Sequence, residues 1–537
     1  MLKIKIIQEN PIVGDISGNI KKIQEEVDKA SSNDIDLLVF SEMFVSGYPP
    51  EDLVIRADFI SKIDESIKKL AKNTKDIALL FGAPTRKGQK IFNSALLIEN
   101  GLLTEVYSKQ RLPNYKEFDE RRYFSPGENN SILNLKGIKI GLSICEDIWS
   151  KDFTKDLVDE GAELIINLSA SPYTITKKET RLSMLEEYFD ELDVPIIYVN
   201  QVGGQDELVF DGSSLIIGSE QSKMVSLKSF DVDYKELVIT KKDKILMSVI
   251  DERKNIYSEL EDIYNALVLG TKDYVEKNGF NGIILGSSGG IDSALTAAIA
   301  YDALGSSKVN TVMMPFDFTA DISINDAQEL ADNMSINHSI ISIKKMYEAF
   351  SNSLVESFKG KDPDKTEENL QSRCRGVTLM ALSNKLGFLV LTTGNKSEAA
   401  VGYSTLYGDT AGGFSVLKDV SKTLVYELVN YRNQITPIIP QRIIDRPPSA
   451  ELAPDQKDTD ALPDYDVLDP IIEMYVEKDL SPEEIISKGY EESEVRRILA
   501  LIDFNEYKRR QVPLGIKISD RNFGKDRRYP ITNKWKP

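Results

Sequence analysis

Three residues of complementary chemistry, Glu42, Lys109 and Cys145, each lie at or near the end of a predicted strand. A free thiol with a pKa of about 8.5 is only slightly ionised at neutral pH, so a nucleophilic cysteine needs a base or a nearby cation. Glu42 can accept the thiol proton. Lys109 can stabilise the thiolate and the oxyanion of a tetrahedral intermediate, together with the backbone N–H that follows Cys145. Taken singly, such residues more often pack or face solvent, so the combination and its sequence context carry the prediction of an amide-cleaving site.

A glycine- and serine-rich loop follows a predicted strand and opens a predicted helix in the second half of the chain. It comprises Gly286, Ser287, Ser288, Gly289, Gly290, Ile291, Asp292 and Ser293. Such a turn directs free backbone N–H groups, the helix dipole and small hydroxyls at one spot, which can hold a phosphate or pyrophosphate. An isolated Gly-Gly pair is more often a tight turn, but here two serines and an aspartate surround the glycines. The loop lacks the lysine of G-x-x-x-x-G-K-[ST], which argues against a kinase-type or motor-type ATP site.

The motif SGGIDS in this loop resembles the pyrophosphate loop of ATP pyrophosphatases, which adenylate a carbonyl oxygen and release pyrophosphate. The resemblance implies that Asp292 binds Mg²⁺, an oxygen-ligand role that suits a carboxylate beside phosphates. A second predicted strand ends in TTGNKSE, where Glu398 can supply another carboxylate to the metal and Thr393 can contact ATP. Alone, TTGNKSE could be a capped helix start, and the glycine-rich loop makes the nucleotide interpretation the better one.

The elements that must position these residues are short strands alternating with helices. In the first half, strands are predicted at residues 3–8, 37–40, 77–81, 94–98, 138–144, 164–168 and 196–199. Several run into a polar residue, namely Glu42, Cys145 and Asn200. Layered α/β enzymes place their chemistry there, because loops beyond a sheet edge are held by rigid strands but open to substrate.

The sequence from about Ser226 to Asp251 is Lys- and Asp-rich with scattered apolar residues, and helical spacing follows it. We therefore expect two domains, 1–250 and 251–537. In the second, strands at 309–313 and 388–392 alternate with helices, which predicts a mostly parallel, doubly wound sheet. Two stretches, 359–368 and 447–469, are predicted to be mobile loops because they contain too few apolar residues to offset the entropy of ordering.

Composition limits the class of protein. The 537 residues are 41% hydrophobic and carry a net charge of −19, which fits a globular chain of two large domains and disfavours general binding to nucleic acid or anionic membranes. No apolar run approaches the roughly 18 residues of a membrane span and no signal-like segment opens the chain, so we expect a cytoplasmic protein. Two cysteines and one histidine argue against a disulfide framework or a Cys/His zinc site. We interpret Cys374 as a buried apolar group and His338 as a surface or loop residue.

The first half of the chain resembles the nitrilase superfamily, specifically the glutamine-hydrolysing domain of glutamine-dependent NAD synthetases. The resemblance runs from residue 4 to about 217 and rests on VFSEMFVSGYPPEDL, KQRLPNYKEFDERRYFSPG, GLSICEDIW, NLSASPY and GGQDELVFDG. It implies a nitrilase-like α-β-β-α layered sandwich in which Glu42 is the base, Cys145 the nucleophile and Lys109 the third member. Glu120 matches a supporting carboxylate of the family. Tyr115, Ser171 and Lys177 match the positions that contact glutamine. The chain departs from the family at Ser41, where proline is usual.

The resemblance continues through EENLQSRCRG, LMALSNKLG, LTTGNKSEAAVGYSTLYGDTAGGF, PPSAELAPDQKD, EYKRRQ and DRRYPITNKW. It implies a Rossmann-like ATP-pyrophosphatase domain in which Mg-ATP adenylates deamido-NAD and ammonia then displaces AMP to give NAD. Asn369, Glu398 and Lys508 match dinucleotide-contacting positions, and Lys422 matches a phosphate-contacting lysine. The family commonly has Pro-Pro-Gly where this chain has PLG after KRRQ.

Fusing the two activities has a chemical reason. Ammonia released into neutral water becomes ammonium, which has no lone pair with which to attack an acyl-adenylate. We therefore expect an enclosed route for ammonia between the sites, completed by a homo-oligomer, either a dimer or a dimer-based octamer. The small-molecule partners are deamido-NAD, ATP and L-glutamine.

Three rival interpretations were weighed against this one. A GMP-synthetase type would need a Cys-His-Glu glutaminase, but the single histidine, His338, lies in the other half. An asparagine-synthetase type would need cysteine at position 2, where this chain has Leu2. A non-catalytic ligand sensor would have no need for Glu42, Lys109 and Cys145 together with Asp292.

Overall fold

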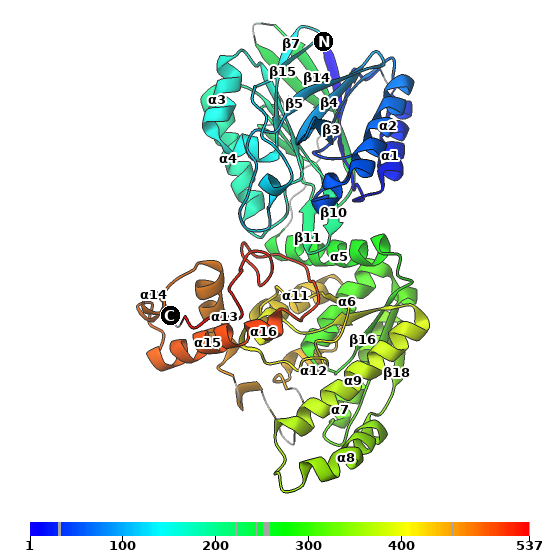
Figure 1. The fold of residues 1–537 in the computed structure, drawn as a ribbon, viewed down its shortest axis with the longest axis vertical. Helices are drawn as coiled ribbons and strands as arrows, with labels where there is room; N and C mark the ends of the chain where they lie inside the picture. The colour runs from blue at the N-terminus through cyan, green and yellow to red at the C-terminus, as the bar shows by residue number, and fades with distance from the viewer. Residues whose placement is uncertain are drawn as a thin grey trace. The chain divides into compact units, whose positions relative to one another are not determined.

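The computed structural model describes residues 1–30, 34–220, 223–242, 244–250, 258–449, 451–453, 456, 458–460 and 462–535. The chain forms two compact units, Met1–Ser258 and Glu259–Pro537 (Figure 1). The predicted domain boundary at Asp251 falls within 251–257, outside the described residues.

The first unit contains two large β-sheets flanked by helices (Figure 1). One sheet has the strand order β15-β14-β1-β2-β3-β4-β5, with β1 Leu2–Gln8, β2 Leu37–Val39, β3 Ala78–Lys87, β4 Lys90–Glu99, β5 Leu102–Ser108, β14 Asp233–Lys241 and β15 Ile245–Ile250. The other has the order β13-β12-β9-β8-β7-β6, with β6 Ile132–Leu135, β7 Ile138–Ile144, β8 Leu164–Ser169, β9 Ile196–Asn200, β12 Leu215–Ile217 and β13 Met224–Ser226. A hairpin of β10 Val202–Gln205 and β11 Leu208–Asp211 is separate from both.

Helices cover the outer face of each sheet, which gives the predicted α-β-β-α layering (Figure 1). They are α1 Ile16–Ala30 and α2 Ala57–Asn73 on one side and α3 Lys151–Asp159 and α4 Lys177–Leu192 on the other. The unit also contains three short 3₁₀ segments in its connecting loops, η1 Glu51–Ile55, η2 Glu120–Arg122 and η3 Cys145–Trp149.

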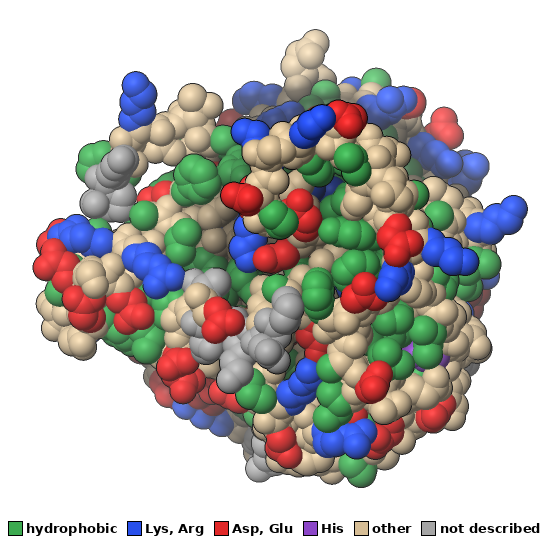
Figure 2. All heavy atoms as spheres, turned by 90° about the horizontal axis from the view of Figure 1, so that it is seen from below, with side chains coloured by type: hydrophobic (Ala, Val, Ile, Leu, Met, Phe, Trp, Pro, Cys, Tyr) green, Lys and Arg blue, Asp and Glu red, His purple; other side chains and the backbone are tan. Residues whose placement is uncertain are grey.

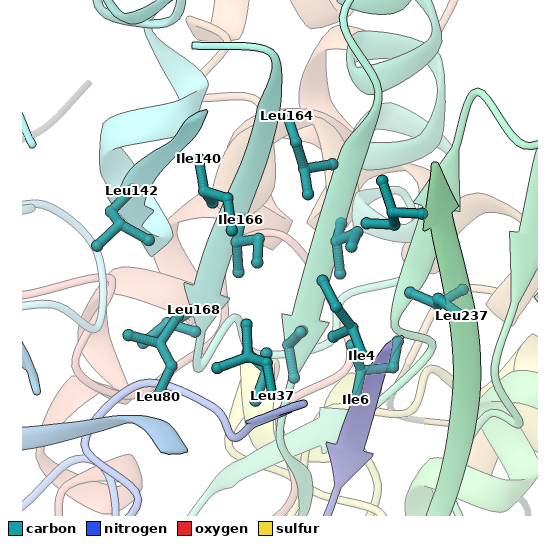
Figure 3. Close-up of a cluster of buried hydrophobic side chains, with 14 of the residues drawn as sticks. Ile4, Ile6, Leu37, Leu80, Ile140, Leu142, Leu164, Ile166, Leu168 and Leu237 are labelled. Atoms are coloured by element: carbon teal, nitrogen blue, oxygen red, sulfur yellow. The ribbon is translucent and has the colours of Figure 1, made fainter. Parts of the chain in front are cut away.

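The core between the two sheets consists of aliphatic side chains from both (Figure 3). The first sheet contributes Ile4, Ile6, Leu37, Leu80 and Leu237, and the second contributes Ile140, Leu142, Leu164, Ile166 and Leu168. Because strand side chains alternate between faces, Ile7 and Leu38 belong instead to the cluster beneath α1 and α2. Burial on both faces explains why these strands are nearly continuous apolar runs in the sequence.

The Lys- and Asp-rich stretch before the boundary is part of the first sheet. β14 pairs antiparallel with the whole of β1, from Leu2 opposite Ile239 to Gln8 opposite Asp233. Its buried side chains recur at every second residue, Leu237 and Ile239 among them, as expected for a strand with one covered face. From the sequence these residues were noted only as scattered apolar positions in a charged stretch, and their period of two was missed.

The second unit is built on one parallel sheet of order β18-β17-β16-β19-β20. The strands are β16 Ile283–Gly286, β17 Val309–Met313, β18 Asn337–Ile340, β19 Leu389–Thr392 and β20 Phe414–Ser415. The strand order reverses at β16, so the carboxyl ends of β16 and β19 lie side by side at the topological switch point, where open α/β sheets bind ligands. The loop after each of these strands carries predicted site residues.

Helices surround this sheet and extend into a C-terminal helical cluster (Figure 1). They are α5 Glu259–Lys277, α6 Ile291–Leu304, α7 Asp321–Met334, α8 Lys344–Phe358, α9 Lys365–Leu386, α10 Lys396–Val401, α11 Lys422–Ile435, α12 Gln441–Asp445, α13 Tyr465–Ile472, α14 Pro482–Ile486, α15 Glu492–Phe504 and α16 Glu506–Arg509. Short 3₁₀ turns occur at η4 Ser306–Lys308 and η5 Asp458–Asp460, and a π-helical turn, η6 Glu473–Glu477, continues α13.

Both predicted mobile loops contain ordered helix. α9 begins at Lys365 with a capping box, in which the Asp364 carboxylate accepts from the Thr366 N–H and Glu367 accepts from the Asp364 N–H. This reciprocal capping orders a polar segment without apolar burial. In the second stretch α13 starts at Tyr465 and packs into the C-terminal cluster, whereas residues 450, 454, 455, 457 and 461 lie outside the described residues.

His338 and Cys374 can also be placed. His338 lies in β18, where its Nδ1 is 2.8 Å from the Thr311 hydroxyl, so its assignment to a loop was wrong. Its neighbours Asn337 and Ser339 made the strand hard to recognise. Cys374 is buried in α9, as predicted.

Over the described part of the chain, no helix has the length and apolar character needed to cross a membrane. Figure 2 shows acidic and basic side chains interspersed over one face of the molecule, with hydrophobic side chains between them.

Candidate active sites

The turn that carries Glu42 follows β2 and packs tightly against β3. The Gly82 N–H donates to the Ser41 carbonyl, and the carbonyl of Gly82 accepts from the Val45 N–H. A Cβ at Gly82 would lie 2.2 Å from the Met43 nitrogen and 2.7 Å from the Glu42 Cα. Glycine at this position therefore permits the close approach that fixes the direction of the Glu42 side chain.

Lys109 joins two buried carboxylates. Its Nζ donates to Glu42 Oε1 at 2.8 Å and to Glu120 Oε1 at 2.9 Å, and none of the three side chains is more than 4% exposed. Glu42 Oε1 also accepts from Asn93 Nδ2 at 2.7 Å, and its Oε2 accepts from the Ala170 N–H at 2.8 Å. Glu42 is thus held by three partners, Lys109, Asn93 and the Ala170 N–H, which leaves little freedom for its carboxylate.

Cys145 lies directly after β7 with φ of 43°, in the left-handed region that non-glycine residues rarely adopt. Burial raises the pKa of the Cys145 thiol well above its usual value, the charge of Glu42 raises it further, and the ammonium of Lys109 opposes both. The thiol is therefore neutral in the free protein. A base must take its proton when an amide arrives, and Glu42 is the carboxylate with the largest effect on it.

The same cluster determines the charge of Lys109 and Glu120. Burial lowers the pKa of Lys109, but the neighbouring carboxylates outweigh it and leave that pKa well above its usual value. Burial raises the pKa of Glu120 to about 7, although Lys109 opposes the shift. Tyr48 donates to Glu120 Oε1 at 2.8 Å. Lys109 therefore stays cationic beside the thiol.

The three predicted glutamine contacts lie around Cys145. Tyr115 is exposed, and its hydroxyl is 2.9 Å from both oxygens of Glu146, the residue after Cys145. Burial lowers the pKa of Lys177, a shift opposed chiefly by Cys145, and its ammonium lies 5.2 Å from the Trp149 ring centroid. The Ser171 N–H donates to Asn200 Oδ1 at 2.9 Å. The Tyr115 phenol thus contacts the carboxylate of the residue after Cys145, and the charge of Lys177 acts on the same carboxylate.

Several members of this site were not predicted from the sequence. Asn93, Tyr48 and the Ala170 N–H each bond one of the predicted carboxylates. Asn93 carried a usable signal, since it is a polar residue inside the apolar strand IFNSALLI. Tyr48 and Ala170 carried none, because their contacts depend on how distant loops fold over the sheet ends.

The second site is a cavity of about 270 Å³ at the carboxyl ends of β16 and β19. All eight residues of the predicted phosphate loop, Gly286 through Ser293, line it, and so do Thr393, Glu398 and Lys422. Among the residues that line the cavity, Ser287 of the loop and Thr392 of β19 each have a buried hydroxyl without a hydrogen bond to any described residue. These hydroxyls are free to bind a polar ligand inside the cavity.

The phosphate loop is shaped by glycine and by serine–backbone bonds. Gly289 has φ of 76°, and a Cβ there would lie 2.4 Å from the Ser323 carbonyl oxygen. The Ser288 hydroxyl accepts from the Gly290 N–H at 3.2 Å, and the Ser293 hydroxyl donates to the Gly290 carbonyl at 2.9 Å. The loop enters α6, whose first turn carries Asp292. This geometry matches a backbone cradle for phosphate at a helix N-terminus.

Asp292, Glu398 and Lys422 form a charged cluster on the cavity wall. The Lys422 ammonium contacts Asp292 Oδ2 and lies 3.7 Å from Glu398 Oε1. Burial lowers the pKa of Lys422, and the two carboxylates reverse this and raise it. Burial and the charge of Asp292 raise the pKa of Glu398 to about 8, against the effect of Lys422. Asn395 fixes Asp292 through a bond of 2.9 Å to Oδ1.

Asp469 of α13 ties together the helices that carry Glu398 and Lys422. It accepts from the Ser397 hydroxyl, and its Oδ2 accepts from both the N–H and the hydroxyl of Thr423 at 2.9 Å. The Ser397 oxygen in turn accepts from the Lys422 N–H at 2.9 Å. The start of α10 and the start of α11 are therefore fixed to one buried carboxylate.

These residues are compatible with Mg²⁺. Asp292 and Glu398 would hold the ion, since two nearby carboxylates beside a phosphate cradle are the donors that Mg²⁺ uses together with substrate phosphates and water. Burial and the charge of Asp292 raise the pKa of Glu398, and a bound cation would act in the opposite direction. Among the described residues no group of three or more His, Cys, Asp or Glu could hold a metal by itself.

Two predicted dinucleotide contacts lie elsewhere. Lys508 donates to the carbonyls of Gly402 at 2.8 Å and Ser404 at 2.9 Å, and the Thr405 hydroxyl donates to Asn369 Oδ1 at 2.8 Å. Neither Lys508 nor Asn369 is among the described residues that line the cavity, but both hold the 402–405 turn after α10.

Several charged residues of the cavity wall were not predicted, and Arg375 and Asp458 are two of them. Burial lowers the pKa of Arg375 to about 10, and its Nε donates to the Met314 carbonyl. Asp458 is buried, and Tyr465 donates to its Oδ2 at 2.9 Å. Arg375 lies within QSRCRG, which was noted only for its family likeness, and Asp458 lies in the stretch taken for a mobile loop.

The first unit is a layered, amidase-like fold with a Cys-Glu-Lys cluster. The second is a doubly wound fold with a cavity lined by the SGGxDS loop. Together they define a class of protein with two sites, one for nitrogen transfer and one for ATP chemistry. The family model "Carbon-nitrogen hydrolase" matches residues 3–230, and "NAD synthase" matches residues 263–512.

Curated relatives match over the full length. The glutamine-dependent NAD(+) synthetase of Acinetobacter baylyi is 46% identical over 100% of this chain and 99% of its own, and that of Thermotoga maritima is 43% identical over the same shares. The solved glutamine-dependent NAD+ synthetase of Acinetobacter baumannii, in complex with ADP, is 43% identical with a TM-score of 0.80 over 99% of this chain and 98% of that one. A solved structure from Cytophaga hutchinsonii shares the fold, with a TM-score of 0.84 at 22% identity over 99% of this chain and 98% of that one.

The chain belongs to the family of glutamine-dependent NAD(+) synthetases. The predicted enzyme family and the two-part α/β fold are both confirmed.

Proposed function

We propose that the protein makes NAD from deamido-NAD, ATP, L-glutamine and water, and releases AMP, pyrophosphate and L-glutamate. The observation that carries the proposal is the Lys109 ammonium bonded to Glu42 beside a buried Cys145 thiol, in a chain whose other unit has a phosphate-cradle cavity. Full-length relatives named for this activity support it.

At the first site, the Cys145 sulfur attacks the side-chain amide carbon of glutamine while Glu42 takes the thiol proton. Lys109 and the N–H after Cys145 stabilise the oxyanion. The C–N bond then breaks, and ammonia leaves with a proton from Glu42. Water activated by Glu42 hydrolyses the thioester and releases glutamate. Glu120 holds Lys109 from its other side. Tyr115, Ser171 and Lys177 are the proposed glutamine contacts.

At the second site, a carboxylate oxygen of deamido-NAD attacks the α-phosphorus of ATP, and pyrophosphate leaves. Ammonia then attacks the acyl carbon, and AMP leaves as the amide forms. The loop from Gly286 to Ser293 and Thr393 would bind ATP, and Lys422 would contact phosphate. Mg²⁺ held by Asp292 and Glu398 would neutralise phosphate charge when bound. Asn369, Glu398 and Lys508 are the proposed dinucleotide contacts.

Ammonia is proposed to pass between the sites without release to water, in a homo-oligomer. The support is chemical, because protonation in bulk water would remove the lone pair that the acyl-adenylate requires. Turnover with ¹⁵N-glutamine in the presence of unlabelled ammonium tests it. Product nitrogen should come almost entirely from glutamine, and equal competition would contradict the route.

Cys145→Ala separates the two activities. The variant should lose glutamine-driven NAD synthesis and retain ammonia-driven synthesis, measured as NAD, AMP and pyrophosphate formed from deamido-NAD and Mg-ATP. Retention of the glutamine-driven reaction would refute the assignment of the nucleophile, and absence of both reactions in the parent protein would refute the proposed function.

A further inference from the structure

One buried carboxylate outside the predicted site links the segments that carry Lys109 and Cys145. Asp147 belongs to η3, two residues after Cys145, and is fully buried. Its Oδ1 accepts from the backbone N–H of Arg111 at 2.8 Å and from that of Gln110 at 3.2 Å. These are the two residues that follow Lys109.

The other oxygen of Asp147 completes the link. Oδ2 accepts from the Tyr107 hydroxyl at 2.8 Å and from the Ile144 N–H at 3.1 Å. Tyr107 precedes Lys109 by two residues, and Ile144 is the residue before the cysteine. One carboxylate therefore bonds the chain on both sides of Lys109 and at the turn of Cys145.

The four bonds use the full acceptor capacity of an ionised carboxylate. Burial raises the pKa of Asp147 to about 6, and the Arg111 N–H and the charge of Lys109 oppose the shift. At neutral pH the group is mostly ionised, as four donors require. The Cys145 backbone has φ of 43°, and such a conformation persists only where its surroundings enforce it.

We propose that Asp147 is a positioning residue of the glutamine-hydrolysing site, which fixes the Lys109 segment and the Cys145 turn to one anchor and thereby sets the separation of ammonium and thiol. It touches neither substrate nor the reacting atoms. The inference rests on the proposed function, because it concerns the efficiency of glutamine hydrolysis by Cys145.

Asp147→Asn tests the proposal. The amide has one acceptor oxygen and an NH₂ group, so it cannot accept all four bonds, while size and shape are kept. A misplacement of about 1 Å costs on the order of 100-fold in rate, so the glutamine-driven kcat should fall about 10- to 100-fold with little change in the KM for glutamine. Ammonia-driven synthesis should remain within about twofold of the parent.

A second readout follows the thiol itself. The rate of Cys145 alkylation by iodoacetamide, measured by peptide mass spectrometry from pH 6 to 10, should fall in Asp147→Asn across this range, because Lys109 no longer lies at its native distance from the sulfur and favours the thiolate less. Asp36→Asn is the matched control: its carboxylate also accepts a backbone N–H, from Lys3 at 2.9 Å, but lies outside the site. It should change neither readout.

The outcomes are distinct. If Asp147→Asn folds and keeps its glutamine-driven kcat within twofold, or if ammonia-driven synthesis falls equally, the proposal is overturned. If Asp147→Asn does not fold, Tyr107→Phe removes one of the four donors and should lower the glutamine-driven kcat about fivefold; an unchanged kcat there also overturns the proposal. Cys145→Ala is assayed in parallel, and its retention of glutamine-driven synthesis would refute the proposed function itself.

Discussion

Replacing Lys109 by methionine should destabilise the first unit in a pH-dependent way. The substitution keeps the length of the side chain but removes a buried ammonium that donates to Glu42 at 2.8 Å and to Glu120 at 2.9 Å. Breaking a buried ion pair by removing one partner costs about 3–5 kcal/mol, because the remaining charge stays buried without compensation. We expect a loss of that size at pH 8.

The sign of the pH dependence follows from Glu120. Its pKa in the folded protein is raised to about 7 from an ordinary 4.5, and Lys109 opposes the shift, so removing Lys109 raises that pKa further. A raised folded-state pKa gives a contribution to stability that is present below pH 4.5 and lost as the pH rises through the folded value. Between pH 7, the folded value in the parent, and pH 8 lies one pKa unit, which corresponds to about 1.4 kcal/mol, so the loss in Lys109→Met should be smaller at pH 5 than at pH 8 by up to about that amount.

The two tryptophans allow the measurement to be confined to the first unit. Trp149 lies in the first unit and Trp535 in the second, so a Trp535→Phe background leaves Trp149 as the only tryptophan, whose fluorescence can be excited selectively during urea unfolding. Lys136→Met is the matched control. Lys136 also forms an ion pair, with Asp36 at 2.5 Å, but its side chain is 54% exposed. Such surface pairs contribute about 0–1 kcal/mol. Equal losses in the two variants, or a loss in Lys109→Met that does not grow from pH 5 to pH 8, would refute the reasoning.

Two further substitutions test how the sites are held. In Gly82→Ala the new methyl would overlap the Met43 nitrogen, so the turn carrying Glu42 must shift, and glutamine-driven synthesis should fall on the order of 100-fold while ammonia-driven synthesis is kept. Gly88→Ala is the control, because a methyl there has no atom within 4 Å. Comparable rates of glutamine-driven synthesis in the two variants would contradict the packing argument. Asp469→Asn should loosen the starts of α10 and α11 and raise the Mn²⁺ dissociation constant, followed by electron paramagnetic resonance, about 10-fold. The exposed Asp466→Asn on the same helix should leave it unchanged, and an unaltered constant in Asp469→Asn would exclude a positioning role.

The central parallel strands were predictable because they are short, β-branched runs buried on both faces, whereas the exposed parallel edge strand β18 was missed. β7, Ile138–Ile144, has the bounds that the sequence predicted. β14 and β15 were missed, because a strand with one exposed face shows alternation instead of a continuous run. Charged residues on the exposed face then dominate the local composition.

The site residues were predictable to different degrees. Cys145 and Asp292 stand in short motifs whose chemistry is visible in the residues themselves. Asn93 and Asp147 act through backbone and side-chain bonds that form only when segments distant in the sequence meet. No pattern in one sequence specifies which buried polar group will bond another, because that depends on packing across the whole unit.

The pairing of β1 with β14 has a consequence for how the first unit is made. β1 leaves the ribosome long before β14, so one of its two neighbours is synthesised more than 200 residues later. Until then an apolar strand has one unpaired edge, which is a template for association with other nascent chains. A fragment that stopped at residue 230, where the match to carbon-nitrogen hydrolases ends, would keep that edge open permanently. Anyone who wishes to separate the amidase from its partner should therefore cut beyond β15.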